Sequence, residues 1–153
     1  MKNLQLKTKF KSLFVAFFAL TLFSFQHANA QKLVTVKSAK DFNTTVDGIV
    51  SDAGMMVLAE INHGKILSMT GLTLNAESIF IGNPNVGKDA FTDNRAVGLA
   101  IPIRLNVYED KGVTYINYFT PSSELGNFKG DKVKMIGEEL DKKIAMLTGM
   151  SSK

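Results

Sequence analysis

Apolar residues recur along the chain at two spacings, and each spacing predicts one kind of secondary structure. The strongest helical signal lies near the C-terminus, where apolar residues at three- and four-residue intervals run from Val133 to Leu147. We expect a long helix there that ends at Gly149, because glycine commonly follows the last turn of a helix.

A second apolar stripe predicts another main helix over residues 39–53. Ser38, followed three residues later by Asp41, resembles a capping box at the start of this helix. Gly54 follows its last apolar residue and is expected to end it. A shorter helix is predicted close to Gly71, over residues 65–72.

Alternating or continuous apolar runs predict about five strands. The clearest pair is a hairpin that turns at Asp110-Lys111-Gly112. The run before His63 is apolar except for Glu60 and is expected to be a buried strand. The predicted strands are residues 32–37, 55–61, 77–81, 103–108 and Val113–Phe119.

This succession of strands and helices predicts a single α+β domain over residues 31–153. We expect an antiparallel or mixed sheet of about five strands with two main helices packed on it. No internal repeat or low-complexity linker divides the segment.

Residues 1–30 have the three-part layout of a secretory signal peptide. Four lysines precede an uncharged run from Leu13 to Phe25, and Ala28-Asn29-Ala30 forms a cleavage motif. The run is shorter than the roughly 18 residues of a spanning helix. We therefore expect the domain to be exported, to the periplasm or the extracellular space. The alternative is an uncleaved membrane anchor.

Removal of this segment would change the charge of the protein. The whole chain carries 18 basic and 14 acidic residues, a net charge of +4. The four lysines lie in the first thirty residues, which contain no acidic residue, so the remaining domain has no net charge with histidine neutral. The charge therefore gives no argument for binding to anionic membranes, and we expect no nucleic-acid partner.

The chain has no cysteine and two histidines, of which His27 lies in the predicted signal peptide. The absence of cysteine excludes disulfides, thiolate metal sites, cysteine nucleophiles and covalent c-type haem attachment. A single histidine, His63, excludes a multi-histidine zinc site within one copy of the domain.

The run from Gly82 to Lys88 nearly matches the phosphate-binding P-loop, G-x-x-x-x-G-K-[ST], and follows an apolar strand. Asp89 stands where a hydroxyl should hold magnesium, and its carboxylate would repel phosphate. The segment after Asp89 is also a poor candidate for the required helix, and an exported domain meets little nucleoside triphosphate. A nucleotide hydrolase is therefore a remote alternative, and a rigid strand-end turn is preferred.

Short motifs spread over residues 34–147 resemble the domain-of-unknown-function family 302, which consists of small bacterial and archaeal α+β domains. The resemblance implies the fold and a homodimer, and it brings no established reaction. The residues that carry it are Phe42 and Thr45, Gly54 to His63, Gly71-Leu72, Ile81-Gly82-Asn83-Pro84, Ile101-Pro102-Ile103-Arg104, Val107-Tyr108-Glu109-Asp110, Tyr118 and Pro121.

The sequence departs from the family pattern at two places. Asn62 replaces the acidic residue that usually precedes the histidine, and Gly87-Lys88 replaces a small polar pair. An asparagine can neither ionise nor act as a base, so chemistry that depends on an acid–histidine pair is in doubt.

His63 is the main candidate for chemistry, because it follows a strand and stands beside Gly64 in a loop. It could bind a metal ion or haem, or act as a general base, with Glu60 orienting its ring. The alternative is a histidine that stabilises the turn through backbone hydrogen bonds.

Gly82, Asn83 and Arg104 are the other candidate ligand-binding residues. The glycine and asparagine could form an anion-binding nest, or a tight turn in which asparagine bonds to nearby backbone. Arg104 lies on the polar side of a predicted strand and could clamp a carboxylate or phosphate. It could instead pair with Glu109 or Glu60.

These observations favour a small exported module that binds a ligand or a partner and acts as a homodimer. We expect its site to be a pocket that joins His63, Asn83 and Arg104. One alternative is a haem- or metal-binding protein that uses His63, and another is an enzyme of unknown class. No complete catalytic set is evident, so an enzyme is less favoured.

Overall fold

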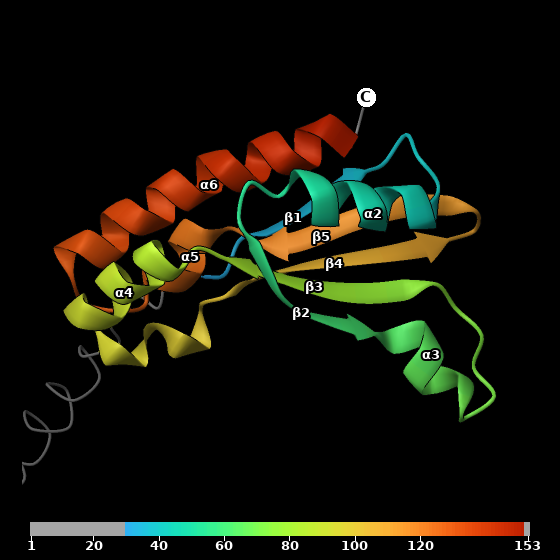
Figure 1. The fold of residues 1–153 in the computed structure, drawn as a ribbon, viewed down its shortest axis with the longest axis horizontal. Helices are drawn as coiled ribbons and strands as arrows, with labels where there is room; N and C mark the ends of the chain where they lie inside the picture. Colours follow the sequence, from blue (N-terminus) through green and yellow to red (C-terminus); the bar gives the residue numbers. More distant parts are fainter. Residues whose placement is uncertain (1–29, 152–153) are drawn as a thin grey trace, which may run out of the picture.

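Five antiparallel strands form one sheet in the computed structural model, which describes residues 30–151. Their order across the sheet is β1-β5-β4-β3-β2, so every strand pairs with antiparallel neighbours (Figure 1). The predicted α+β fold is confirmed. The strands are β1 (Leu33–Lys37), β2 (Met56–Asn62), β3 (Ala76–Gly82), β4 (Ile103–Asp110) and β5 (Val113–Phe119).

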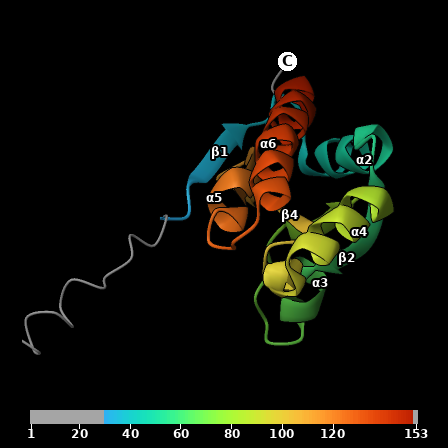
Figure 2. The ribbon, with the colours of Figure 1, turned by 90° about the vertical axis from the view of Figure 1, so that its left-hand side faces the viewer.

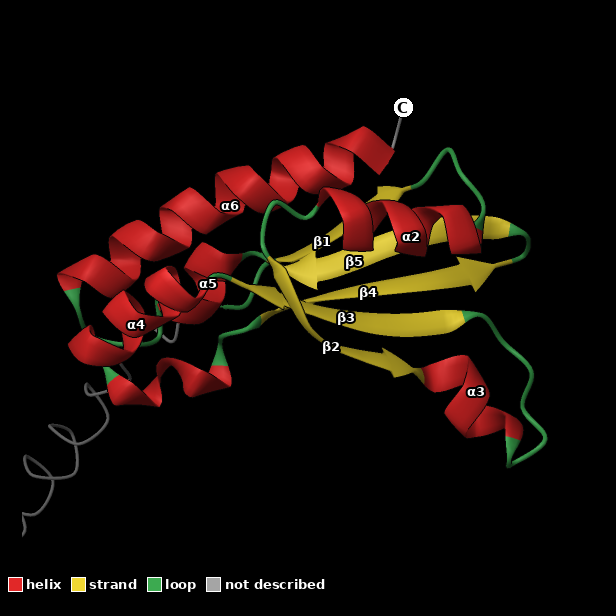
Figure 3. Cartoon of the chain, viewed as in Figure 1, coloured by secondary structure: helices red, strands yellow, loops and turns green. Residues whose placement is uncertain are grey.

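In the described part of the chain, two main helices cover one face of this sheet, as predicted, and four short helices lie at its ends (Figure 3). Seen from one end, α4, α5 and the start of α6 stand in front of the sheet (Figure 2), whereas α3 extends from the opposite end (Figure 1). The helices are α2 (Phe42–Asp52), α3 (His63–Ser68), α4 (Pro84–Asp93), the 3₁₀ helix η1 (Arg95–Leu99), α5 (Pro121–Leu125) and α6 (Asp131–Ser151).

Alternate residues of the central strands build the core. Side chains on successive strand residues point to opposite faces, so every second residue faces the helices. On that face, strand side chains pack in one apolar cluster with the stripe of α6, which includes Leu140 and Ile144. The fully buried apolar strand residues on this face are Ile79, Ile81, Ile103, Leu105, Val107 and Ile116.

The strand predicted to be buried before His63 is instead an edge strand. β2 pairs only with β3, and most of its residues are exposed. Leu58 lies in a bulge between the paired residues Val57 and Ala59. The continuous apolar run therefore led to a wrong prediction of burial. The position of a strand within the sheet depends on its pairing, which the run does not report.

The ends of both main helices differ from the prediction. Asp41 alone caps α2, its side chain accepting a hydrogen bond from Thr44 N, and the helix begins at Phe42. Ser38 is buried and bonds to Thr45 Oγ1 at 2.8 Å instead. Gly149 does not end α6, which continues to Ser151; the Ser151 carbonyl accepts hydrogen bonds from Ala39 N and Ser38 Oγ, just before α2.

The glycine-rich run is a helix start rather than a loop. α4 begins at Pro84, two residues beyond the strand residue Gly82, and Asn83 caps it. We expected the segment after Asp89 to be a poor helix, and this expectation is wrong. The helix α4 already starts inside the glycine-rich run and continues through Asp89. The helix contains ten residues. The apolar residues Ala96 to Leu99, shortly before Pro102, lie in η1.

Within residues 30–151, no helix combines the length and apolar character needed to cross a membrane. All but the last residue of the predicted signal peptide, residues 1–30, lies outside the described part of the chain.

Candidate functional site

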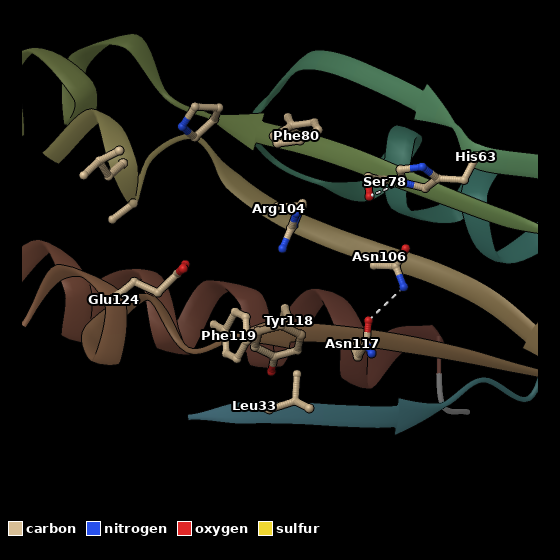
Figure 4. A pocket seen from close by; sticks show the side chains of 13 residues that line it. Leu33, His63, Ser78, Phe80, Arg104, Asn106, Asn117, Tyr118, Phe119 and Glu124 are labelled. Atoms are coloured by element: carbon tan, nitrogen blue, oxygen red, sulfur yellow. Dashed lines mark hydrogen bonds between the residues drawn. The ribbon is translucent and has the colours of Figure 1, made fainter. Parts of the chain in front are cut away.

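The face of the sheet opposite the helices contains a hollow of about 590 Å³, which we call the open-face hollow (Figure 4). It lies where the middle of the sheet meets α5 and η1. Polar and apolar side chains contribute together, and those from the strands share one side of the sheet by alternation, except Tyr118, which packs in the core at the edge of the hollow. The hollow is lined by Leu33, His63, Ser78, Phe80, Leu99, Ala100, Pro102, Arg104, Asn106, Asn117, Tyr118, Phe119 and Glu124.

His63 forms one end of the open-face hollow. It is the first residue of α3, and its Nε2 lies 2.8 Å from the Ser78 hydroxyl of β3 (Figure 4). Ser78 is buried, so this contact holds the ring in place. The ring is therefore oriented by a serine hydroxyl, not by Glu60 or by backbone as the sequence suggested.

Asn62, which departs from the family pattern, has a structural role beside this histidine. Its side-chain oxygen accepts a 2.7 Å hydrogen bond from Lys65 N and caps α3. Its amide donates to Glu77 Oε2 at 3.2 Å. Burial, reinforced by the charge of Glu60, raises the pKa of Glu77.

Arg104 lies at the centre of the hollow on β4, where it is exposed. Its guanidinium and the Glu124 carboxylate of α5 point toward each other from opposite sides (Figure 4). Burial raises the pKa of Glu124, and the positive charge of Arg104 opposes this rise. The acidic neighbour of Arg104 is thus Glu124, and not Glu109 or Glu60 as expected.

Two amides complete the polar part of the floor. Asn106 Nδ2 donates to Asn117 Oδ1 at 3.0 Å across the β4–β5 pair. Phe80 and Phe119 lie half-buried on the same side of the sheet. The hollow therefore offers one cation, several hydrogen-bonding groups and aromatic surface for a small polar ligand.

The structure separates the predicted site residues into two groups. His63 and Arg104 line the open-face hollow, whereas Gly82 and Asn83 line a different, apolar hollow at the end of the sheet. The expected single pocket for His63, Asn83 and Arg104 is therefore not seen, since β3 runs past the open-face hollow before it reaches Gly82. The binding role of each residue stays a prediction.

The backbone of the glycine-rich run does not form a phosphate cradle. Asn83 Oδ1 accepts hydrogen bonds from the N–H groups of Asn85, at 2.9 Å, and Val86, at 3.4 Å. The Gly87 N–H donates to the Asn83 carbonyl. These amides are the ones that a P-loop would offer to phosphate, so the structure adds a reason against the nucleotide hydrolase.

The haem or metal alternative depends on His63 alone. Among residues 30–151, no three His, Cys, Asp or Glu side chains gather as a metal site. Coordination through His63 Nε2 would also require the contact with Ser78 to break. The described residues therefore offer a poor match to a metal centre within one copy.

Sequence reasoning missed Ser78, Asn106, Asn117 and Glu124 as site residues. The alternation of β4 already placed Asn106 on the side of Arg104, so that residue could have been found. The other three reach the hollow through strand pairing and the position of α5, for which the sequence carries no local signal.

Comparison with known proteins gives partial matches to three curated relatives. The chain is 37% identical over 82 residues to the fluoride-specific ion channel FluC 1 of Brucella suis and of Brucella abortus, and to FluC 2 of Brucella melitensis. Each match covers 51% of this chain and 32%, 30% and 30% of those proteins, respectively. The chain therefore spans about a third of their length.

A solved structure supports the fold over most of the domain. The crystal structure of an uncharacterized conserved protein DUF302 from Bacillus stearothermophilus superimposes with a TM-score of 0.71 and 22% sequence identity. The match covers 78% of this chain and 97% of that one. The model of the family described as domain of unknown function DUF302 matches residues 34–148. The chain therefore belongs to the DUF302 family.

Proposed function

We propose that this protein is an exported binding module that acts as a homodimer and takes a small anionic ligand in the open-face hollow. The observation that carries the proposal is the convergence of Arg104, His63 and Asn106 on one hollow of about 590 Å³. This volume falls within the roughly 300–1,000 Å³ of typical small-molecule sites.

Arg104 indicates that the ligand is an anion. A guanidinium binds carboxylates and phosphates through a planar pair of hydrogen bonds. Glu124 stands opposite Arg104 and restricts the space next to it, so the ligand must offer its anionic group to the side of Arg104 that faces Asn106. The amides of Asn106 and Asn117 supply further hydrogen bonds there.

The uncovered face of the sheet supports the homodimer. Leu33 is 56% exposed and Ile61 is 38% exposed on this side, and Phe80 and Phe119 are half-buried. Apolar surface left in water favours association, and a second copy would cover it. A partner there would also close the open-face hollow and remove water from around Arg104.

Export is proposed from the N-terminal segment alone. The basic start, the apolar run and the Ala28-Asn29-Ala30 motif support cleavage before Gln31. N-terminal sequencing of the protein purified from a host with a periplasm tests this step separately from binding.

Native mass spectrometry of the full chain, expressed from Met1 and purified without refolding, tests both the homodimer and the bound ligand. We expect a dimer that carries a small acidic molecule, which is released when the solution is made acidic. A monomer that carries nothing would contradict both halves of the proposal.

The chain offers a matched pair of arginine variants for the ligand half. Arg104→Ala should remove the co-purifying anion, whereas Arg95→Ala, an exposed arginine of η1, should leave it bound. Equal loss of the anion from both variants would show that it binds through the overall positive charge of the protein, and would contradict a site at Arg104.

A further inference from the structure

A second hollow lies at the end of the sheet where β2 and β3 meet α4. We call it the apolar hollow; it has a volume of about 380 Å³ and lies among Leu58, Gly82, Val86, Phe91, Pro102 and Leu140. It is separate from the open-face hollow, which shares with it only the wall residue Pro102 among the described residues.

Two glycines line the apolar hollow. A Cβ built on Gly82 would lie 3.0 Å from Leu58 Cδ1, so a side chain there would enter occupied space at the wall. A Cβ built on Gly87 would meet nothing within 4 Å. A larger side chain introduced at Gly87 would therefore have room to enter this space.

The lining contains almost no polar group. Asn83 has the only polar side chain among the described residues around the hollow, and its oxygen is committed to the cap of α4. A charged or strongly polar group would lose its hydration there without gaining a partner. The occupant must therefore be a hydrocarbon group, with any polar end in the solvent.

The mouth and the size define the occupant further. Leu58 is 51% exposed and Phe91 is 43% exposed, so contact with a ligand would remove their apolar surface from water. At about 30 Å³ for each water-sized group, the volume holds about a dozen such groups. That is the size of one medium-length alkyl chain.

We propose that the apolar hollow binds the alkyl chain of a single-chain amphiphile, with about eight to twelve carbons inside. The proposal is independent of the anion site at Arg104. The alkyl chain of the ligand provides the driving force for binding, because its hydrocarbon is buried against Val86, Phe91 and Leu140.

Titration calorimetry of the full chain with decanoate and with decyl maltoside, both below their micelle concentrations, tests the proposal. The two probes share a ten-carbon tail and differ in the charge of the headgroup. We expect saturable binding of both at one site per chain. Binding of decanoate alone would show that a carboxylate site, and not the apolar hollow, is responsible.

Variants locate the binding. Gly87→Leu places a side chain into the empty space and should weaken both probes at least tenfold. Gly48→Leu is the matched control, because a Cβ at this helical glycine of α2 also meets nothing within 4 Å, and it lines neither hollow. Equal affinity in Gly87→Leu and Gly48→Leu would overturn the proposal.

A second pair of variants with smaller changes keeps the test valid if the leucine variants do not fold. Leu58→Gln changes the exposed mouth and should weaken both probes, whereas Met69→Gln, 82% exposed and outside the hollow, should not. Thermal melts of each variant show that it is folded before titration. No saturable binding of either probe to the wild-type chain, or equal affinity in this second pair, would also overturn the proposal.

Discussion

The two faces of the sheet use the same strands for different purposes. On the helix side, Leu105 and Ile116 are fully buried in one apolar cluster. On the open side, their neighbours Arg104, Asn106 and Asn117 remain accessible and line a hollow. The difference shows that consecutive residues of one strand can build the core and line an open hollow separately, so changes on one face can be tested against changes on the other.

The largest contrast is expected between two adjacent residues of β4. Leu105→Ala should lower the free energy of unfolding by about 2–5 kcal/mol, because it leaves a cavity in the core. Asn106→Ala should cost about 0.5–1.5 kcal/mol, through loss of its hydrogen bond to Asn117. Urea denaturation followed by circular dichroism measures both. Equal losses would show that the open face also carries the stability of the fold.

A smaller contrast is expected within the helix layer. A Cβ at Gly137 of α6 would lie 2.9 Å from the Ser122 Cα, so Gly137→Ala should lower the free energy of unfolding by about 1–3 kcal/mol. A Cβ at Gly149 of the same helix meets nothing within 4 Å, so Gly149→Ala should raise stability by up to about 1 kcal/mol. Thermal denaturation compares them, and destabilisation by Gly149→Ala alone would contradict the close contact of α5 with α6.

The smallest effect concerns a carboxyl group on the helix side of the sheet. Burial and the charge of Glu60 raise the pKa of Glu77, so the folded protein holds this proton to higher pH than the unfolded chain. Its contribution to stability is therefore full at low pH and is lost as the pH rises through the ordinary glutamate range to the raised pKa. Glu77→Gln should remove this loss and gain stability relative to wild type as the pH rises.

Urea denaturation at a series of pH values measures this effect. Glu109→Gln, at an exposed glutamate of the hairpin, is the control for the loss of one carboxylate from the protein. If the plots of unfolding free energy against pH for Glu77→Gln and wild type ran parallel over the pH range in which glutamates titrate, Glu77 would not be the source of the pH dependence.

Much of the fold could be predicted because its signals are local. The alternation from Ile103 onward defined the hairpin, and the apolar stripe of Val133 to Leu147 defined α6 within two to four residues of its ends. Errors arose where packing overrides local signals. β2 is apolar yet lies at the edge, and the glycine-rich run begins a helix because Asn83 and Pro84 together favour a helix start.

The candidate site could be predicted only in part. His63 and Arg104 stood out as the single histidine of the domain and an arginine on the polar side of a strand. Their partners Ser78 and Glu124 did not, because they lie 15 and 20 positions away in the sequence. Asn83 was grouped with the site by its family motif, although its side chain caps α4.

The sequence by itself determined the kinds of elements, the face on which each β4 residue lies, and the chemistry that is absent, such as thiolate and multi-histidine sites. These features follow from spacing and composition, which need no long-range contact. The tertiary structure decided which strand became an edge, which polar residues meet at the open-face hollow, and that Gly82 and Asn83 border the apolar hollow. Those outcomes depend on strand register and on how helices pack, and both are set by contacts between residues far apart in the chain.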